Sequence, residues 1–282
     1  MIGLTVVAAG TSLPELVVSL IAQVKGSSDL AVGNVIGSNI FNIGMVLGVL
    51  ALFRVMPIPG STAKLEFPVL LATSLAILWI ARGGGEGADG LFTRTEGICM
   101  LIALVVFIGV TIRVARKHVS AAEKAAFTEE VTEASGIDVI PVIPLAWTLA
   151  QVTLGAAGLW LGGAWLVSGA VVVAEHFSIS ERVIALTIVA GGTGAPELVA
   201  SIVAVRRGKG DMAVGNVIGS NLFNLLAILG FTSAVKPLTA PAAILEWDLY
   251  WMLGITLLLI PFFFRSDPRI RRLEGGLILA TY

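Results

Sequence analysis

One stretch of sequence occurs twice in this chain and decides its fold. Residues 4–42 are LTVVAAGTSLPELVVSLIAQVKGSSDLAVGNVIGSNIFN, and residues 186–224 are LTIVAGGTGAPELVASIVAVRRGKGDMAVGNVIGSNLFN. Extended to residues 2–43 and 184–225, the two copies align without a gap at an offset of 182, and 26 of the 42 positions are identical. Internal similarity of this kind indicates a duplicated unit. The chain is therefore predicted to consist of two related halves.

The composition places the chain among membrane proteins. Of its 282 residues, 56% are hydrophobic and 13% are charged, with a mean hydropathy of +0.95, whereas an average soluble domain has roughly 25% charged residues. Several apolar runs are long enough to cross a lipid bilayer as helices. We therefore predict an all-α transmembrane bundle. The predicted spans are residues 2–23, 30–53, 66–81, 96–114, 142–174, 182–205, 211–234 and 247–264, followed by a stub from residue 275.

The number of spans between the two copies sets their relative orientation. The copies lie in the first and sixth spans, so they should cross the membrane in opposite senses, as inverted repeats do. Of the 18 Lys and Arg residues, 13 fall in one set of alternate connections and 5 in the other. The richer side is predicted to be cytoplasmic. The predicted domains are a first half (1–115), a cytoplasmic linker (116–141) and a second half (142–282).

Several classes of function are disfavoured by the residues themselves. The net charge is -1 and no basic stripe is present, so nucleic acid is not an expected partner. His118 and His176 lie at span ends, and no HExxH motif occurs, so neither a zinc site nor an enzyme is expected. No bound cofactor and no particular oligomeric state are predicted.

Each copy places one carboxylate in the middle of a span. Glu15 and Glu197 follow GTSLP and GTGAP, at a depth where an ionisable group is costly unless it meets partners or water. The alternative is a protonated carboxyl that hydrogen-bonds between helices, but two symmetric copies favour a functional site. Pro14 and Pro196 lack an amide hydrogen, so each motif helix should break nearby and free backbone carbonyls.

Side chains that carry oxygen accompany both carboxylates. Hydroxyls lie within one helical turn of them, and the next span of each half carries Asn, Ser and Asn at intervals of four residues, on one helix face. Oxygen ligands suit hard cations such as sodium and calcium. The candidate side-chain ligands besides the carboxylates are Thr11, Ser12, Ser38, Asn42, Thr193, Ser220 and Asn224.

A structural role is the alternative for the polar face of each second span. The glycines beside it, such as Gly33 and Gly37, have the spacing of close helix packing, and packing is the role we assign to them. Asn39 and Asn221 lie off the polar face. They are predicted to connect helices.

The motifs GTSLPE with GNVIGSNIFN, and GTGAPE with GNVIGSNLFN, resemble the two alpha-repeats of the cation/calcium exchanger superfamily, especially prokaryotic sodium/calcium exchangers. The resemblance covers the whole chain. It implies an inverted-repeat helical bundle in which four motif helices surround the ion sites, while a long tilted helix in each half slides. It also implies central carboxylates at Glu15 and Glu197, the hydroxyl and amide ligands named above, and backbone carbonyl ligands at Ala8 and Ala190.

The chain departs from the family pattern in two ligand positions and in length. Gly194 stands where many members have a second Ser, and Asn224 stands where many sodium/calcium exchangers have Asp. These departures argue against a stoichiometry of three sodium ions. The family's long first helix and most of its last have no counterpart here, so a fragment is expected. Residues 142–173 correspond to the long helix of the second half.

The function implied by the resemblance is secondary active antiport. Calcium would be exchanged for sodium by alternating access at a midplane carboxylate site in a prokaryotic plasma membrane. Two carboxylates can neutralise one calcium ion, two sodium ions or protons, so exchange of calcium or another divalent ion against protons stays open. A membrane fragment that binds ions without transporting them is the alternative from a different class.

Overall fold

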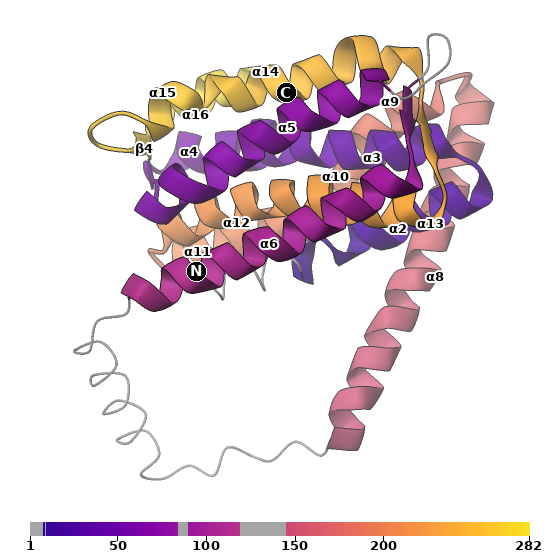
Figure 1. The fold of residues 1–282 in the computed structure, drawn as a ribbon, viewed down its shortest axis with the longest axis horizontal. Coiled ribbons are helices and arrows are strands. Elements are labelled where there is room, and N and C mark those ends of the chain that lie inside the picture. The colour runs from indigo at the N-terminus through magenta and orange to yellow at the C-terminus, as the bar shows by residue number, and fades with distance from the viewer. Residues whose placement is uncertain (1–7, 9, 84–89, 119–144) are drawn as a thin grey trace.

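The apolar runs of the sequence form helices in the computed structural model, which describes residues 8, 10–83, 90–118 and 145–282. Most of the helices lie alongside one another in a bundle (Figure 1). In the names used below, η denotes a π-helix. The helices of the first half are α2 (Leu13–Lys25), α3 (Ser28–Ile40), η1 (Phe41–Leu47), α4 (Gly48–Phe53), η2 (Thr62–Glu66), α5 (Phe67–Gly83) and α6 (Arg94–His118).

The second half repeats this order after one long helix. Its helices are α8 (Leu145–Phe177), α9 (Glu181–Ile184), η3 (Ala185–Val189), α10 (Ala190–Thr193), α11 (Ala195–Arg206), α12 (Gly210–Phe223), η4 (Asn224–Ile228), α13 (Leu229–Val235), η5 (Ile244–Asp248), α14 (Leu249–Leu258), α15 (Ile260–Phe263) and α16 (Arg272–Ala280).

The predicted spans agree with these helices wherever the structure describes them. Among the described residues, five continuous helices are long and apolar enough to cross a membrane, and a bent pair makes a sixth candidate. Helix α6 continues to His118, into the predicted linker 116–141, whose remaining residues lie outside the described part of the chain. The same is true of residues 142–144 at the start of the predicted long helix.

Both motif helices are interrupted where the prolines predicted it. In the second half, α10 and α11 meet at Gly194 and are bent by 43°. In the first half, α2 begins only after Ser12, the position equivalent to Gly194. Proline cannot donate a main-chain hydrogen bond and obstructs the preceding turn, so the break follows from the sequence.

The duplication extends beyond the aligned motifs. The π-helices η2 and η5 begin at Thr62 and Ile244, which are again 182 residues apart (244 − 62 = 182). A π-helix interrupts the regular hydrogen-bond pattern of an α-helix, and these occur at matching positions. The two halves therefore share local geometry as well as sequence.

The glycines of the motif allow helices from different halves to touch. A Cβ added at Gly37 would lie 2.8 Å from the Leu186 Cα and 2.9 Å from the Ala190 Cβ, and one at Gly33 would lie 2.7 Å from the Ala185 Cβ. Helix α3 therefore packs directly against η3 and α10. The packing role predicted for these glycines is confirmed.

Two short antiparallel ladders connect the halves. Strand β1 (Met56–Pro57) pairs with β4 (Arg269–Ile270), and β2 (Gly90–Phe92) pairs with β3 (Leu238–Ala240). In each ladder, one strand comes from the first half and one from the second. Each ladder also joins two connections that the distribution of basic residues places on the same side of the membrane. This pairing agrees with the predicted alternation of spans.

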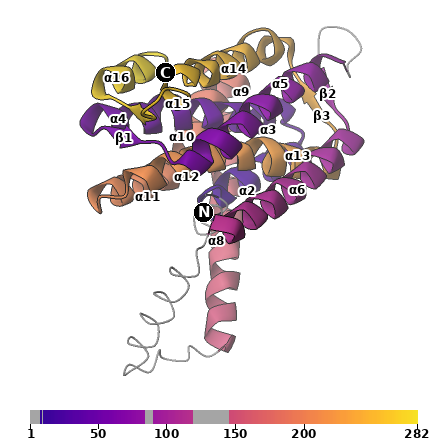
Figure 2. The ribbon, with the colours of Figure 1, turned by 60° about the vertical axis from the view of Figure 1, so that its left-hand side comes forward.

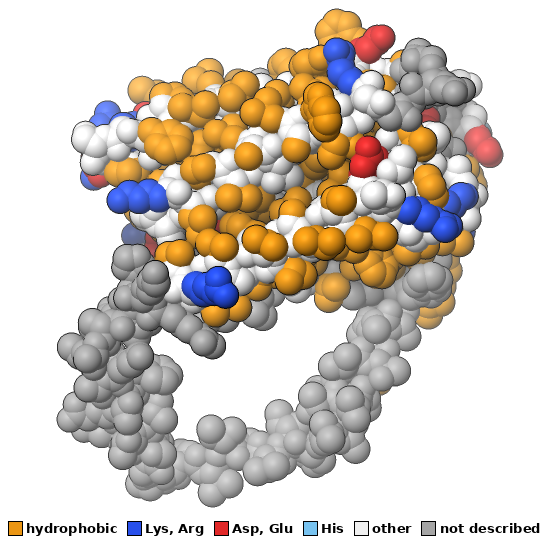
Figure 3. Space-filling model, viewed as in Figure 1, with side chains coloured by type: hydrophobic (Ala, Val, Ile, Leu, Met, Phe, Trp, Pro, Cys, Tyr) orange, Lys and Arg blue, Asp and Glu red, His pale blue; other side chains and the backbone are white. Residues whose placement is uncertain are grey.

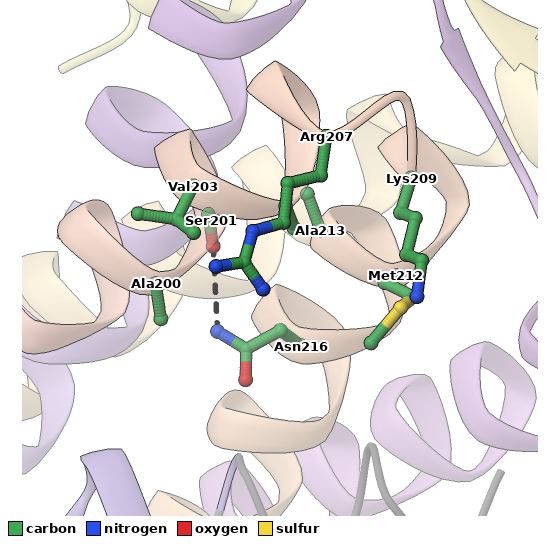
Figure 4. Close-up of a pocket in the computed structure, with 9 residues that line it drawn as sticks. Ala200, Ser201, Val203, Arg207, Lys209, Met212, Ala213 and Asn216 are labelled. Carbon is green, nitrogen blue, oxygen red and sulfur yellow. Dashed lines mark hydrogen bonds between the residues drawn. The ribbon is translucent and has the colours of Figure 1, made fainter. Parts of the chain in front are cut away.

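Helix α8 makes the two halves unequal. It runs at a steep angle to the rest of the bundle (Figures 1 and 2) and packs against α2, where the Lys25 Nζ donates a hydrogen bond of 2.7 Å to the Ser168 Oγ. In the second half, Val199 of α11 is 60% exposed. A hollow of about 320 Å³ lies between α11 and α12. In Figure 4 the Arg207 side chain extends toward Ser201 and Asn216, which also line this hollow.

The surface has the polarity of a membrane protein. Hydrophobic side chains cover most of the face in Figure 3, and Lys and Arg side chains gather toward the ends of the helices. Large apolar residues are exposed along the spans, such as Trp79 at 78% and Val105 at 68%. An apolar belt of this kind fits the hydrocarbon core of a bilayer.

We expect Gly37→Ala to destabilise the bundle by about 1–3 kcal/mol, because the new methyl group meets the backbone of η3 and the core must shift to admit it. Thermal unfolding in detergent measures the effect. Gly109→Ala on α6 is the matched control, because a Cβ there has nothing within 4 Å and alanine favours a helix by up to about 1 kcal/mol. Equal melting temperatures for the two variants would contradict this account.

Candidate functional site

The two motif carboxylates are brought together in the centre of the bundle. Glu15 lies at the start of α2 and Glu197 at the start of α11, and both side chains are fully buried. Glu197 is close enough to Glu15 for the two charges to repel each other. Two like charges in a buried site are costly without cations or protons. This pair is the centre of the candidate site.

Hydroxyl groups of the first half reach the carboxylate of the second half. The Ser12 Oγ donates a hydrogen bond of 2.9 Å to the Glu197 Oε1, and the Thr11 hydroxyl also stabilises Glu197. The Thr193 Oγ1 donates instead to the Asn34 Oδ1 at 3.2 Å and to the backbone oxygen of Val189 at 3.1 Å. The sequence places Ser12 within a turn of Glu15, but in the structure its hydroxyl crosses to Glu197 of the other half.

Asn34 connects the two motifs from α3. Its Nδ2 donates to the backbone oxygen of Glu15 at 3.2 Å and to the Ser19 Oγ at 3.0 Å, while its Oδ1 accepts from the Thr193 Oγ1 at 3.2 Å. Asn34 was not among the candidate ligands. Its place on the polar helix face with Ser38 and Asn42 was the signal in the sequence that could have identified it.

Several buried oxygens of the candidate set have no hydrogen-bond partner among the described residues. Such an atom costs about 1–3 kcal/mol in a dry interior. Six of the predicted side-chain ligands contribute one or more of them. These oxygens are both carboxylate oxygens of Glu15, the Glu197 Oε2, the Ser38 Oγ, the Asn42 Oδ1, the Ser220 Oγ and the Asn224 Oδ1.

The two predicted carbonyl ligands lie beside the helix breaks but are not freed by them. The Ala8 oxygen accepts from the Ser12 amide at 3.1 Å, and the Ala190 oxygen accepts from the Gly194 amide at 2.9 Å. Both carbonyls keep their main-chain hydrogen bonds up to the break. The Ala8 oxygen also accepts from the Thr11 Oγ1 at 3.2 Å, and the Ala190 oxygen from the Thr193 Oγ1 at 3.4 Å. A role as ligand stays a prediction for both.

The asparagines of the site stand at π-helical turns. Asn42 lies in η1, and Asn224 is the first residue of η4. π-Helical turns within α-helices are frequent at functional sites. Residue periodicity in the sequence gave no indication of them.

The candidate ligand set depends on more than charged residues. Within the described part of the chain, no group of three or more His, Cys, Asp or Glu side chains could hold a metal ion. A cation at Glu15 and Glu197 would therefore need hydroxyl, amide and carbonyl oxygens to complete its shell. Calcium accepts such mixed oxygen ligands, usually six to eight of them.

Comparison with known proteins decides the family. The family model described as sodium/calcium exchanger protein matches residues 1–113 and 147–282. The chain belongs to the sodium/calcium exchanger family. The resemblance seen in the two motifs is thereby confirmed, and the chain is a membrane protein of a family that exchanges cations, not of an enzyme family.

Relatives in this exchanger family match the chain along its whole length. The inner membrane protein YrbG of Escherichia coli is 34% identical over 100% of this chain and 83% of its own length. The sodium/calcium exchanger MaX1 of Methanosarcina acetivorans is 30% identical over 100% of this chain and 86% of its own. Solved structures of the sodium-calcium exchanger NCX_Mj match with a TM-score of 0.67 and 30% identity, over 100% of this chain and 83% of theirs. The inverted-repeat helical bundle is thus confirmed.

We expect Glu15→Gln to raise the melting temperature of the ion-free protein by a few degrees and to abolish its stabilisation by Ca²⁺. A buried carboxylate without a partner is costlier than a neutral amide of the same shape, and about 1 kcal/mol corresponds to roughly 2–4 °C in a protein of comparable size. The measurement is thermal unfolding with and without Ca²⁺.

The exposed Glu246 of η5 provides the control for this experiment. Glu246→Gln removes the same charge away from the site and should leave the shift caused by Ca²⁺ unchanged. A ligand at 100 times its Kd adds about 2.7 kcal/mol, which thermal unfolding detects easily. A full Ca²⁺ shift in Glu15→Gln would exclude Glu15 as a ligand.

Proposed function

We propose that this chain exchanges calcium for sodium across a prokaryotic plasma membrane, by alternating access at the site between Glu15 and Glu197. The observation that carries the proposal is a pair of interacting, buried carboxylates, together with buried motif oxygens that have no hydrogen-bond partner among the described residues. Such oxygens are ligands that bind hard cations. Among the relatives, MaX1 is named a sodium/calcium exchanger, and the NCX_Mj structures were soaked with Na⁺, Ca²⁺ or Sr²⁺.

Charge balance supports calcium and sodium as alternative occupants. Glu15 and Glu197 carry at most two negative charges, which one Ca²⁺ or two Na⁺ ions neutralise. An uncompensated charge at this depth costs several kcal/mol. Occupation by either set of ions therefore stabilises the same site, and the two sets should compete for it.

The position of the ligands along the spans supports a site near the middle of the membrane. Asn42 falls near the centre of the span Ser28–Phe53, and Asn224 near the centre of Gly210–Val235. Inverted-repeat transporters bind substrates at that depth, where discontinuous helices meet. The breaks at Ser12 and Gly194 supply such discontinuous helices here.

Alternating access is supported by the way the halves share the site. The Ser12 hydroxyl of the first half donates to Glu197 of the second, so a shift of one half relative to the other changes the surroundings of this carboxylate. Ions can then be released toward one side or the other by rocking of the halves around a fixed site.

We expect vesicles that contain the purified chain and are loaded with Na⁺ to take up radioactive calcium when diluted into Na⁺-free medium. The outward Na⁺ gradient supplies the driving force if both ions share the site. Vesicles loaded with K⁺ are the control, and Glu197→Gln should abolish uptake. Uptake that follows a pH gradient instead would show proton coupling. Calcium binding without uptake under any gradient would show an ion-binding protein that does not transport.

The number of sodium ions per cycle depends on two substitutions in the motif. Asn224 and Gly194 stand at positions where a carboxylate and a hydroxyl would help to hold a third sodium ion, as the family pattern implies. With only two carboxylates, a third Na⁺ leaves an uncompensated positive charge. The chain should therefore exchange two Na⁺ for one Ca²⁺, which moves no net charge.

We expect calcium uptake by the unaltered chain to vary little with membrane potential, and Asn224→Asp to increase that dependence. Each net charge that crosses the membrane contributes about 2.3 kcal/mol per 100 mV. The measurement is calcium flux at several clamped potentials. Strong voltage dependence in the unaltered chain would show that a third sodium ion is carried without the additional carboxylate.

A further inference from the structure

The two site asparagines differ in their hydrogen bonds although they lie in matching sequences. Asn42 belongs to the segment SNIFN and Asn224 to SNLFN, 182 residues apart. The Asn42 Nδ2 donates a hydrogen bond of 3.0 Å to the Asn221 Oδ1. Within the described part of the chain, the amide group of Asn224 has no hydrogen-bond partner at either its nitrogen or its oxygen, although the side chain is fully buried.

The contact with Asn221 fixes which end of the Asn42 amide faces the site. A primary amide carries its donor nitrogen and acceptor oxygen on opposite sides of one carbon. When the nitrogen is held by Asn221, the oxygen points away from it. The Asn42 Oδ1 is buried, and none of the residues that the structure describes forms a hydrogen bond with it. It is therefore free to ligate a cation.

Asn221 is itself held in one orientation. Its Oδ1 accepts from Asn42, and its Nδ2 donates at 3.3 Å to the backbone oxygen of Asn39 on α3. A rotation of the Asn221 amide would place donor against donor at Asn42 and acceptor against acceptor at Asn39. The direction of donation along the hydrogen bonds from Asn42 through Asn221 to the α3 backbone is therefore fixed. It also crosses from the first half to the second.

The equivalent residue in the first half forms no such side-chain hydrogen bond to the site asparagine of the other half. Asn39 corresponds to Asn221, but its Nδ2 donates at 2.7 Å to the Val35 oxygen of its own helix. Its side chain makes no hydrogen bond with Asn224. The two amides of the site are thus not interchangeable in this conformation.

The geometry points to Asn221 as a positioning residue that orients the Asn42 carbonyl oxygen toward the cation. This inference rests on the proposed function, since it assigns Asn221 a role at the same site. A rotated Asn42 amide would present its nitrogen, whose hydrogens carry positive partial charge, to Ca²⁺. Loss of Asn221 should therefore weaken calcium binding through Asn42, without contact between Asn221 and the ion.

A double-mutant cycle tests this dependence. The variants are Asn221→Ala, Asn42→Ala and the combination, each measured for the KM and kcat of Na⁺-driven calcium uptake and for the Kd of radioactive calcium. Asn221→Ala should raise the KM and the Kd about tenfold and leave kcat within a factor of two. Added to Asn42→Ala, it should change the KM less than twofold, because residues that act through one contact are not additive.

Two further variants separate positioning from simple loss of stability. Asn221→Leu fills the space of the amide without an acceptor and should reproduce the KM change even if Asn221→Ala folds poorly. Asn39→Ala removes the equivalent amide and should change the KM less than twofold, because the hydrogen bond of the Asn39 Nδ2 stays within its own helix.

The outcomes distinguish this inference from the proposed function. Normal calcium affinity in both Asn221 variants, or the same loss with and without Asn42, would overturn the positioning role and leave the exchanger intact. Absence of calcium binding by the unaltered chain would overturn the proposed function, and the ligand role of Asn42 with it.

Discussion

The burial of two carboxylates next to each other is the constraint on which this structure depends. Glu15 and Glu197 lie where water is excluded, and each lacks enough protein donors to satisfy its oxygens. The bundle must therefore supply their compensation from outside, as cations or protons. A protein selected for stability alone would replace them with apolar or paired residues. Their presence in both halves therefore indicates that they are retained for function, despite their cost in stability.

The rest of the bundle holds this pair in place. The glycines of α3 allow it to touch η3 and α10, which brings Asn34 within reach of both motifs. Ser12 then crosses to Glu197. Small residues and polar contacts of this kind are the main means of helix association in a membrane, where apolar burial alone gives little preference between partners.

The sequence predicted the parts of this arrangement that depend on local pattern. The apolar spans, the helix breaks before Pro14 and Pro196, and the packing role of the glycines all follow from residue type and spacing. The sequence also named candidate ligands. The structure brings the Ser12 hydroxyl to Glu197 and buries Ser38, Asn42, Ser220 and Asn224, and their binding of ions stays a prediction. What was missed depends on contacts between segments that are distant in the sequence.

The missed features have specific physical reasons. The crossing of hydroxyls between the halves depends on how close the motif helices approach, which no spacing within one motif specifies. The π-helical turns at Asn42 and Asn224 depend on packing as well as on propensity. The different hydrogen bonds of Asn39 and Asn221 arise in segments of nearly identical sequence. Local sequence cannot account for that difference, so it must come from the surroundings of each segment.

The β-ladders restrict how the two halves can move. One joins β1 to β4 and the other joins β2 to β3, so main-chain hydrogen bonds link the halves in two places. By the distribution of basic residues, these places lie at opposite surfaces of the membrane. The halves cannot separate at either surface without breaking a ladder, but they can pivot about the line that joins the two. Helices far from that line would travel farthest, while residues near it would stay nearly still.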